Sequence, residues 1–177
     1  MNTLHVNTEA GFRGGERQMF LLLEGLRARG HGAALCAQPG SDAAKAAAGR
    51  GFPVFEVRMR AEIDLLAVRS IRKILRGAAW DLVHAHTASA HGLAYAATRF
   101  LKVPLVAHRR VDFDLNRHGL FLLNRLKYRA AARIIAISRA VRDVLVAGGV
   151  NEGRIAVGVA LAARRVVKTI QDFDQLH

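Results

Sequence analysis

Apolar residues follow two alternating spacings along this chain. Short runs of neighbouring apolar residues, as at 105–107 and 134–137, are typical of strands buried on both faces. Longer segments between them, such as 14–29, carry apolar residues three or four positions apart, as the inner side of a helix does. We expect strands at residues 4–7, 33–37, 53–57, 81–85, 105–108, 133–137 and 154–157, and helices at 14–29, 42–49, 63–76, 88–101, 117–132, 139–147 and 161–173.

The regular alternation of strand and helix predicts the fold class. Short connections between such units produce a parallel sheet with right-handed crossovers and helices on both faces. We therefore predict one doubly wound α/β domain with a parallel sheet of about six to seven strands. In the helix at 63–76, we expect the buried side to consist of Leu66, Ile71, Ile74 and Leu75. Ligands of such sheets bind beyond the carboxyl ends of the strands, so the loops there are the candidate sites.

Composition narrows the class of protein. The chain has 177 residues, of which 51% are hydrophobic, so it can form one substantial core. Cys36 is the only cysteine, which excludes a disulfide framework and fits a reducing, cytoplasmic compartment. The longest stretch without charged residues, 82–98, contains three histidines and is a poor membrane span.

Positive charge is concentrated in one segment. The net charge is +13, and arginine supplies most of the cations, as a GC-rich genome would also produce. Residues 99–142 hold eleven cations and two acids, which is +9 of the total. This predicts an anionic partner for that segment. A specific nucleic-acid function is not expected, because aromatic residues are only 6% and no helix-turn-helix, zinc or RNP motif is present.

Three loops at expected strand ends carry candidate chemistry. Gly14 and Gly15 open the first helix, where free amides and the helix dipole favour an anion, although a plain tight turn is the alternative. The loop lacks the G-x-G-x-x-G pattern of dinucleotide sites. His108, Arg109, Arg110 and Asp112 follow the fifth strand and suit a phosphate group, although a solvated basic loop is the alternative. Neighbouring cations should disfavour protonation of His108.

The pair His84 and His86 closes the fourth strand. Residues two apart on a strand share a face, so a metal site is one interpretation. Zinc needs a third ligand and usually a fourth, and only His91 and His108 lie nearby in sequence. We therefore expect no metal, a structural role for His84 and a site role for His86.

The helix at 117–132 has a basic stripe with additional apolar residues. Such a helix can lie on an anionic membrane surface, and an ordinary packed helix with solvated arginines is the alternative. The residues of this stripe are Arg117, Phe121, Arg125 and Arg129.

Several motifs together resemble the N-terminal domain of family 4 glycosyltransferases, which have the GT-B fold. The matching pieces are Gly14-Gly15-Glu16, the run from Asp81 to His86, the strand that ends at His108, and the strand that ends at Ser138. Their order and spacing fit across residues 1–157.

The resemblance implies two Rossmann-like domains that face each other across a cleft. The N-terminal domain takes the acceptor and the C-terminal domain takes the nucleotide-sugar donor. Transfer retains the anomeric configuration, with no metal and no other cofactor. Carried onto this chain, the resemblance makes His108 the catalytic residue beside the transferred sugar, and it implies that Gly14 and Gly15 contact the donor phosphate and sugar. It assigns Glu16, His86 and Ser138 to the cleft between the domains. It assigns Arg109, Arg110 and Asp112 to acceptor binding.

The chain departs from the family near its end. After residue 157 it does not continue into a donor domain, so we expect a glycosyltransferase domain at 1–157 and a helical tail at 158–177. The expected function is the acceptor-binding half of an enzyme that transfers a sugar to a cell-envelope glycolipid or polysaccharide. We expect this half to be inactive without the donor domain, to bind the donor weakly and to self-associate. We expect it in the cytoplasm, with peripheral contact at the inner face of the membrane. A non-catalytic binding module is the alternative, and a basic nucleic-acid-binding protein is the less favoured one.

Overall fold

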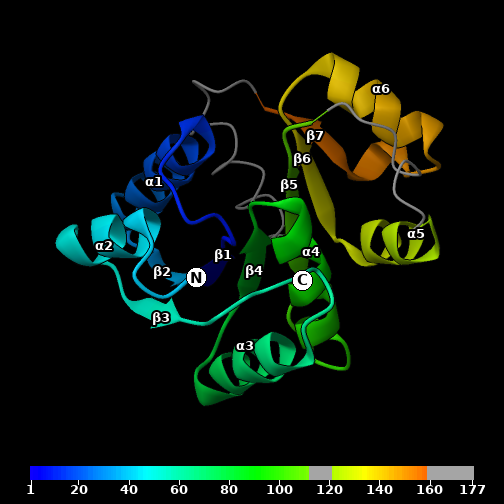
Figure 1. Cartoon of the computed structure of the whole chain (residues 1–177). Helices are drawn as coiled ribbons and strands as arrows, with labels where there is room; N and C mark the ends of the chain where they lie inside the picture. Colours follow the sequence, from blue (N-terminus) through cyan, green and yellow to red (C-terminus); the bar gives the residue numbers. More distant parts are fainter. Residues whose placement is uncertain (112–120, 159–177) are drawn as a thin grey trace.

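The computed structural model describes residues 1–111 and 121–158, with the backbone alone at 121–123. Within these residues, seven parallel strands form one sheet in the order β3-β2-β1-β4-β5-β6-β7 (Figure 1). The order reverses between β1 and β4, which is where ligands bind in doubly wound sheets. The strands are β1 (Asn2–Val6), β2 (Gly32–Ala37), β3 (Val54–Glu56), β4 (Leu82–Ala85), β5 (Leu105–Arg109), β6 (Arg133–Ala136) and β7 (Ile155–Val157).

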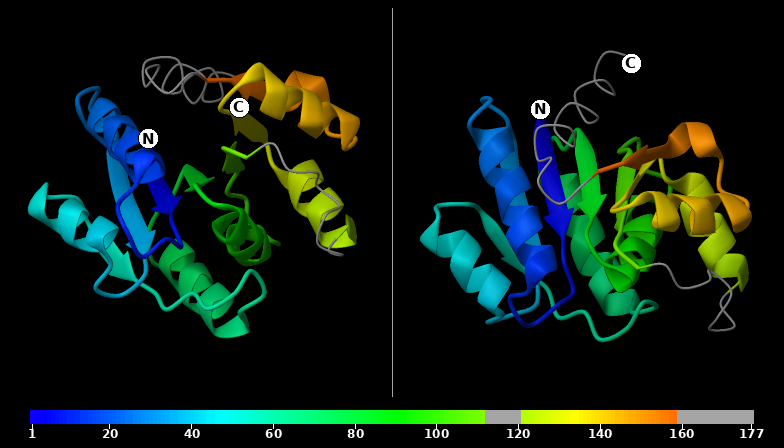
Figure 2. Two further views of the ribbon diagram at one scale, coloured as in Figure 1. Left: turned by 45° about the horizontal axis from the view of Figure 1, so that its top comes forward. Right: turned by 90° about the horizontal axis from the view of Figure 1, so that it is seen from above.

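Helices cover both faces of the sheet (Figure 2). Between consecutive strands the chain forms at least one helix, and a short 3₁₀ helix, Glu152–Arg154, precedes β7. No helix within the described residues is long and apolar enough to cross a bilayer. The α-helices are α1 (Gly14–Arg27), α2 (Asp42–Gly49), α3 (Leu65–Gly77), α4 (Ala88–Thr98), α5 (Phe121–Ala130) and α6 (Arg139–Ala147).

Polar side chains fix where four of these helices begin. Ser41, Asp64, Thr87 and Ser138 each accept a hydrogen bond from a backbone N–H in the first turn of the helix that follows. Such caps satisfy amides that have no partner inside the helix. Each capped helix follows a strand of the parallel sheet and so starts at its carboxyl end, and the Thr87 cap fixes the loop after β4, which borders the candidate site.

The two faces of the sheet have different cores. Leu4 and Val6 of β1 pack with α3 and α4, whereas Leu35 of the neighbouring strand packs with α1 and α2. Side chains alternate across a strand. His5 therefore lies on the α1 face, beside Leu35 in register. A third cluster joins α5, β6 and α6.

The predicted fold class is confirmed, and most boundaries agree within two or three residues. Arg109 belongs to β5 instead of the following loop, because it continues the pairing with β6. The prediction for Leu66 is wrong, since its side chain is 68% exposed and the buried side of α3 consists of Ala67, Val68, Ile71 and Leu75. The tail at 158–177, with its predicted helix at 161–173, lies outside the described residues except for Gly158.

Candidate functional site

A pocket of about 450 Å³ lies at the carboxyl ends of β1, β4 and β5. The loop after β1, the loop after β4, the end of β5 and one residue of α5 surround it. The strand order reverses at this place, so the pocket occupies the expected binding position of the fold. Its lining includes Arg13, Gly15, Glu16, His86, His91, His108, Arg109, Arg110 and Tyr128.

Glu16 holds the first turn of α1 in place. Its carboxylate accepts hydrogen bonds from the backbone N–H of Arg13, at 2.8 Å, and from Nδ2 of Asn7, at 3.1 Å. The bond to Arg13 is the reciprocal half of a capping box. Glu16 is only 3% exposed, so its negative charge also lies within the protein near Arg110. Glu16 thus lines the pocket mainly as a structural residue.

Arg110 connects two loops at the bottom of the pocket. Its Nη1 donates to the carbonyl oxygen of His86 at 2.6 Å, and its Nη2 donates to the carbonyl oxygen of Gly15 at 3.2 Å. A Cβ atom at position 15 would lie 3.0 Å from Nη1 of Arg110, so a glycine allows this close approach. Burial lowers the pKa of Arg110, and the charge of Glu16 opposes that shift.

Four residues below the pocket form a hydrogen-bonded histidine chain, which consists of Arg110, His86, His5 and Thr3. Nη2 of Arg110 lies 3.3 Å from Nδ1 of His86, Nε2 of His86 lies 2.9 Å from Nδ1 of His5, and Nε2 of His5 lies 3.0 Å from the Thr3 hydroxyl. The hydroxyl donates its only proton to the carbonyl oxygen of Gly32.

The direction of the Thr3–Gly32 hydrogen bond determines which ring nitrogens of His5 and His86 carry a proton. Because the Thr3 hydroxyl already donates, it must accept from His5, which places the His5 proton on Nε2. Nδ1 of His5 then accepts from Nε2–H of His86, and Nδ1 of His86 accepts from Arg110. Every bond of the chain is satisfied when both rings are neutral.

Burial keeps the site histidines neutral. It lowers the pKa of His5 and of His108 from 6.5 to about 3, and it lowers the pKa values of His84 and His86 well below 6.5. The charge of Arg110 adds to the effect on His108. The predicted direction for His108 is confirmed, and desolvation is its main cause.

The imidazoles of His84 and His108 retain hydrogen-bonding capacity. Nε2 of His108 and both ring nitrogens of His84 have no hydrogen-bond partner among the described residues. The His84 ring lies between its neighbours, with its centroid 4.2 Å from that of His86 and 6.0 Å from that of His108. His108 is the more open of the two, because it is only partly buried and lines the pocket.

Within the part of the chain that the structure describes, a metal could be held by His5, His84 and His86, whose ligand atoms all lie within 4.8 Å of one another. His5 joins this group in place of His91 and His108, the partners considered from the sequence. The facing nitrogens of His5 and His86 already bond to each other, and the cation Arg110 contacts the ring of His86. A divalent ion would have to break that bond beside a like charge, so the group suits a neutral hydrogen-bonded cluster better.

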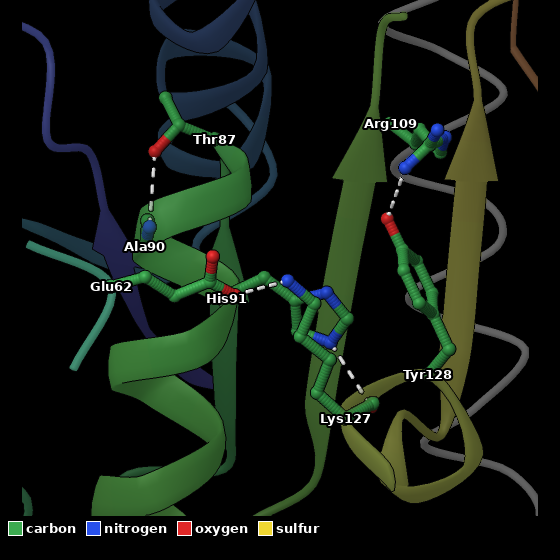
Figure 3. A network of polar contacts seen from close by, with 7 residues as sticks. All are labelled: Glu62, Thr87, Ala90, His91, Arg109, Lys127 and Tyr128. Carbon is green, nitrogen blue, oxygen red and sulfur yellow. Dashed lines mark hydrogen bonds and ion pairs between the residues drawn. The ribbon is translucent and has the colours of Figure 1, made fainter. Parts of the chain in front are cut away.

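A second polar network supports the far wall of the pocket (Figure 3). Lys127 of α5 is 2% exposed and forms an ion pair with Glu62, while its carbonyl oxygen bonds to Nε2 of His91 at 3.1 Å. Nη1 of Arg109 donates to the hydroxyl of Tyr128 at 2.8 Å. Burial lowers the pKa of Lys127, and the bond and charge of Glu62 oppose that shift. The network joins α4, α5 and the end of β5.

The structure brings six of the predicted site residues together. Gly15, Glu16, His86, His108, Arg109 and Arg110 line the same pocket, and Gly14 begins the adjacent helix.

Other predicted residues do not line this pocket. The Ser138 hydroxyl accepts from the N–H of Val141, so it caps α6. Arg125 and Arg129 are exposed on α5. Asp112, Arg117 and the Phe121 side chain lie outside the described residues. The role predicted for each of these residues stays a prediction.

Several residues of the site were not predicted. His5 lies inside an apolar strand, and only its pairing with His84 in register brings it to the histidine cluster. Lys127 was counted only as one of the eleven cations of residues 99–142, yet it is buried against Glu62, which is 65 residues away in the sequence. The apolar residues on both sides of His5 were the one available signal that its side chain is buried.

Comparison with solved structures identifies proteins of the same fold. HepE from Anabaena in complex with UDP-glucose matches with a TM-score of 0.74 and 19% identity, over 90% of this chain and 44% of HepE. A glycosyltransferase from Rickettsia africae matches with a TM-score of 0.72 and 17% identity, over 98% of this chain and 49% of that protein. The lipopolysaccharide outer core galactosyltransferase WaaB matches with a TM-score of 0.67 and 14% identity, over 89% of this chain and 45% of WaaB.

The chain therefore spans less than half the length of these proteins. No curated protein matches its sequence. The sequence model of Glycosyltransferase Family 4, in contrast, matches residues 12–157, which include the glycine turn, the histidine pair and all of the pocket lining except Glu9. On this evidence the chain belongs to glycosyltransferase family 4, and its fold is that of the N-terminal domain of GT-B enzymes.

Proposed function

We propose that this domain supplies the acceptor side of an enzyme that transfers a sugar from a nucleotide-sugar to an anionic glycolipid or polysaccharide of the cell envelope. The observation that carries the proposal is the pocket itself. It combines a neutral histidine, His108, with the buried Arg109, the half-buried Arg110 and the glycine turn of α1, at the strand ends where this fold binds ligands.

His108 is proposed to contact the transferred sugar. Its lowered pKa keeps the imidazole neutral, so it can accept or donate a hydrogen bond to a sugar hydroxyl without adding charge. Nε2 is enclosed and has no partner within the described residues, so a bond to a sugar hydroxyl would satisfy it. A neutral imidazole with a fixed position orients the sugar, which is how a group of this kind lowers the barrier to transfer.

The cations of the pocket favour an anionic acceptor. Arg13, Arg109 and Arg110 contribute three positive charges, against the carboxylates of Glu9 and Glu16. The Glu16 carboxylate is already occupied by Arg13 N–H and Asn7, so it offers little to a ligand. Guanidinium groups bind phosphate and carboxylate with two parallel hydrogen bonds.

The donor is proposed to approach the start of α1. Gly14 and Gly15 leave the backbone amides of this turn open, and the helix N-terminus favours a phosphate. The solved complexes of HepE contain UDP and UDP-glucose, and WaaB is a galactosyltransferase of lipopolysaccharide, which supports a UDP-sugar and an envelope acceptor. The proposed transfer retains the anomeric configuration and uses no metal.

A second domain is proposed to complete the active site. Because sugar transfer requires the donor and the acceptor to be held together, the chain alone should bind each weakly and turn over neither. The proposed setting is the cytoplasm, at the inner face of the membrane.

NMR titration of the chain tests the proposal. UDP-glucose, UDP-galactose and UDP-N-acetylglucosamine are added separately, and each is followed by the shifts of the His108 ring and of the Gly15 amide. We expect millimolar binding of at least one of these donors, and its loss in His108→Ala with the fold retained. The proposal fails if no UDP-sugar and no phosphorylated oligosaccharide perturbs these signals, or if the chain alone transfers sugar efficiently.

A further inference from the structure

Three aliphatic side chains stand exposed where α3 begins. Ile63 is 64% exposed, Leu65 is 74% exposed and Leu66 is 68% exposed. We call these three residues the α3 patch. A soluble surface has little reason to gather three large aliphatic side chains within four positions, and such clusters mark interaction sites.

Asp64 fixes how the α3 patch is presented. Its carboxylate accepts from the backbone N–H groups of Leu66 and Ala67, so α3 must begin at Leu65. The buried side of the helix is then occupied by Ala67 and Val68, which leaves both leucines directed away from the core. The exposure of the α3 patch is therefore set by the cap and by the packing of the helix.

Cations surround the α3 patch, and the nearby acids are engaged. Asp64 caps the helix, Glu62 pairs with Lys127, and Glu56 accepts from the backbone N–H of Gly40. Asp64 and Glu56 keep their negative charges, but four exposed cations outnumber them, so the surface around the α3 patch has a net positive charge. The exposed cations are Arg58, Arg60, Arg69 and Lys73.

The α3 patch lies beside the pocket. Glu62 immediately precedes it and reaches Lys127, whose carbonyl oxygen bonds to His91 in the pocket wall (Figure 3). The ion pair therefore connects the base of the α3 patch to the wall of the pocket through contacts within the protein.

We propose that the α3 patch inserts into the headgroup region of an anionic lipid bilayer, with the four cations on the lipid phosphates. Apolar side chains within a basic surface are the combination that such membranes bind. A protein partner is less suitable, because stable interfaces bury about 800 Å² on each side and are rich in Trp and Tyr, whereas the α3 patch has three aliphatic side chains and no aromatic one.

The inference adds a contact surface that differs from the basic stripe predicted on α5. It rests on the exposure and charge of residues 58–73 and stands independently of sugar transfer. Membrane contact at this place would bring a lipid-anchored acceptor to the edge of the pocket.

Vesicle sedimentation tests the proposal. The chain is mixed with vesicles of phosphatidylcholine alone, or with vesicles that also contain about 30 mol% of the anionic lipid phosphatidylglycerol, because basic surfaces bind anionic lipids. We expect binding to the anionic vesicles and little to the neutral ones. Leu65→Gln/Leu66→Gln should weaken binding about 100-fold, near tenfold for each aliphatic side chain. Arg60→Gln/Arg69→Gln should weaken it and reduce its salt dependence.

Two single variants serve as matched controls. Leu21→Gln on α1 and Leu126→Gln on α5 each remove a side chain about half exposed, at 49% and 52%. If both control variants bind anionic vesicles as the wild type does, the result agrees with the proposal. If Leu126→Gln loses vesicle binding and the Leu65/Leu66 variant does not, the proposal is overturned in favour of α5.

Two further results would also overturn the proposal. One is a wild-type chain that does not bind anionic vesicles. The other is self-association that depends on Leu65 and Leu66 without any vesicle binding, since this would identify the α3 patch as a protein contact. UDP-sugar binding is measured on the same variants and should not change, so failure of this proposal and failure of the proposed function are distinguishable.

Discussion

Nδ1 of His5 lies 2.9 Å from Nε2 of His86, although 81 residues separate them in the chain. The bond joins the middle of β1 to the loop after β4, and Arg110 extends it to β5 and the start of α1. Three strands and the glycine turn are thereby tied together directly below the pocket. Because the bonded nitrogens require neutral rings, the position of this part of the site depends on the protonation state of its histidines.

Replacement of His5 should be more damaging than replacement of His84. His5→Leu leaves Nε2–H of His86 without its acceptor inside the protein, and an orphaned buried donor costs about 1–3 kcal/mol. His84→Leu removes a ring with no hydrogen bond among the described residues, so its free energy of unfolding should stay within about 1 kcal/mol of the wild type or rise. Urea unfolding at pH 7.5 measures both.

The two substitutions have the same volume change and the same buried strand environment, so each controls for the other. Equal destabilisation by both variants would contradict the histidine chain as the source of the difference.

The fold should be lost steeply in acid. His5, His91 and His108 have pKa values lowered to about 3, and those of His84 and His86 are also lowered, from 6.5 when unfolded. The neutral forms therefore stabilise the fold fully above pH 6.5, and this contribution is lost as the pH falls from 6.5 towards 3. Each histidine costs about 1.4 kcal/mol per pH unit in that window.

Five such groups together lower the free energy of unfolding by about 7 kcal/mol per pH unit, which is comparable with the whole stability of a domain. Unfolding curves at pH 7.5, 6.5 and 6.0 measure the slope, and we expect unfolding without denaturant near pH 5. The slope of His84→Leu should be about one fifth smaller. A change in the free energy of unfolding of only about 1.4 kcal/mol per pH unit, as one histidine would give, would disprove the prediction.

Gly92→Ala should destabilise the protein, although alanine favours a helix interior by about 1 kcal/mol over glycine. A Cβ atom at position 92 would lie 2.8 Å from Oε1 of Glu62, so the carboxylate would have to move away from Lys127. A buried ammonium without its partner costs about 3–5 kcal/mol. The net loss expected from thermal or urea unfolding is about 2–4 kcal/mol.

The sign should reverse in a Glu62→Ala background, where no carboxylate remains to be displaced. There Gly92→Ala should stabilise by about 1 kcal/mol through helix propensity alone. Destabilisation of the same size in both backgrounds would show that the ion pair is not the reason for glycine at this position.

Binding of a UDP-sugar should not depend on the charge of His108. Because its pKa is lowered to about 3, the ring stays neutral from pH 8 to pH 6.5, and affinity should be constant over this range. His108→Gln keeps a hydrogen-bonding side chain and should lose about tenfold in affinity, whereas His108→Ala should lose more. A tenfold rise in affinity between pH 8 and pH 6.5 would indicate a protonated His108 instead.

Much of the fold follows from local properties of the chain. The strand order needs only short apolar runs and right-handed crossovers, and the starts of α2 and α6 follow from Ser41 and Ser138, whose hydroxyls bond to the next turn. Gly15, His86 and His108 could also be recognised as candidate site residues. Each lies at or after the carboxyl end of a predicted strand, where ligands bind in this fold.

The remaining features depend on contacts between distant segments, which no local pattern contains. His5 is a functional neighbour of His86 only because β1 pairs with β4, and Lys127 is buried only because Glu62 reaches it across α4. Leu66 was assigned to the wrong side of α3, since the Asp64 cap and the neighbouring helix decide which residues face the core. The sequence by itself determined the elements and the edge of the sheet where the pocket lies. The tertiary structure decided which charges are neutralised, which imidazoles stay neutral and which apolar side chains remain exposed, because burial and pairing are properties of the assembled fold.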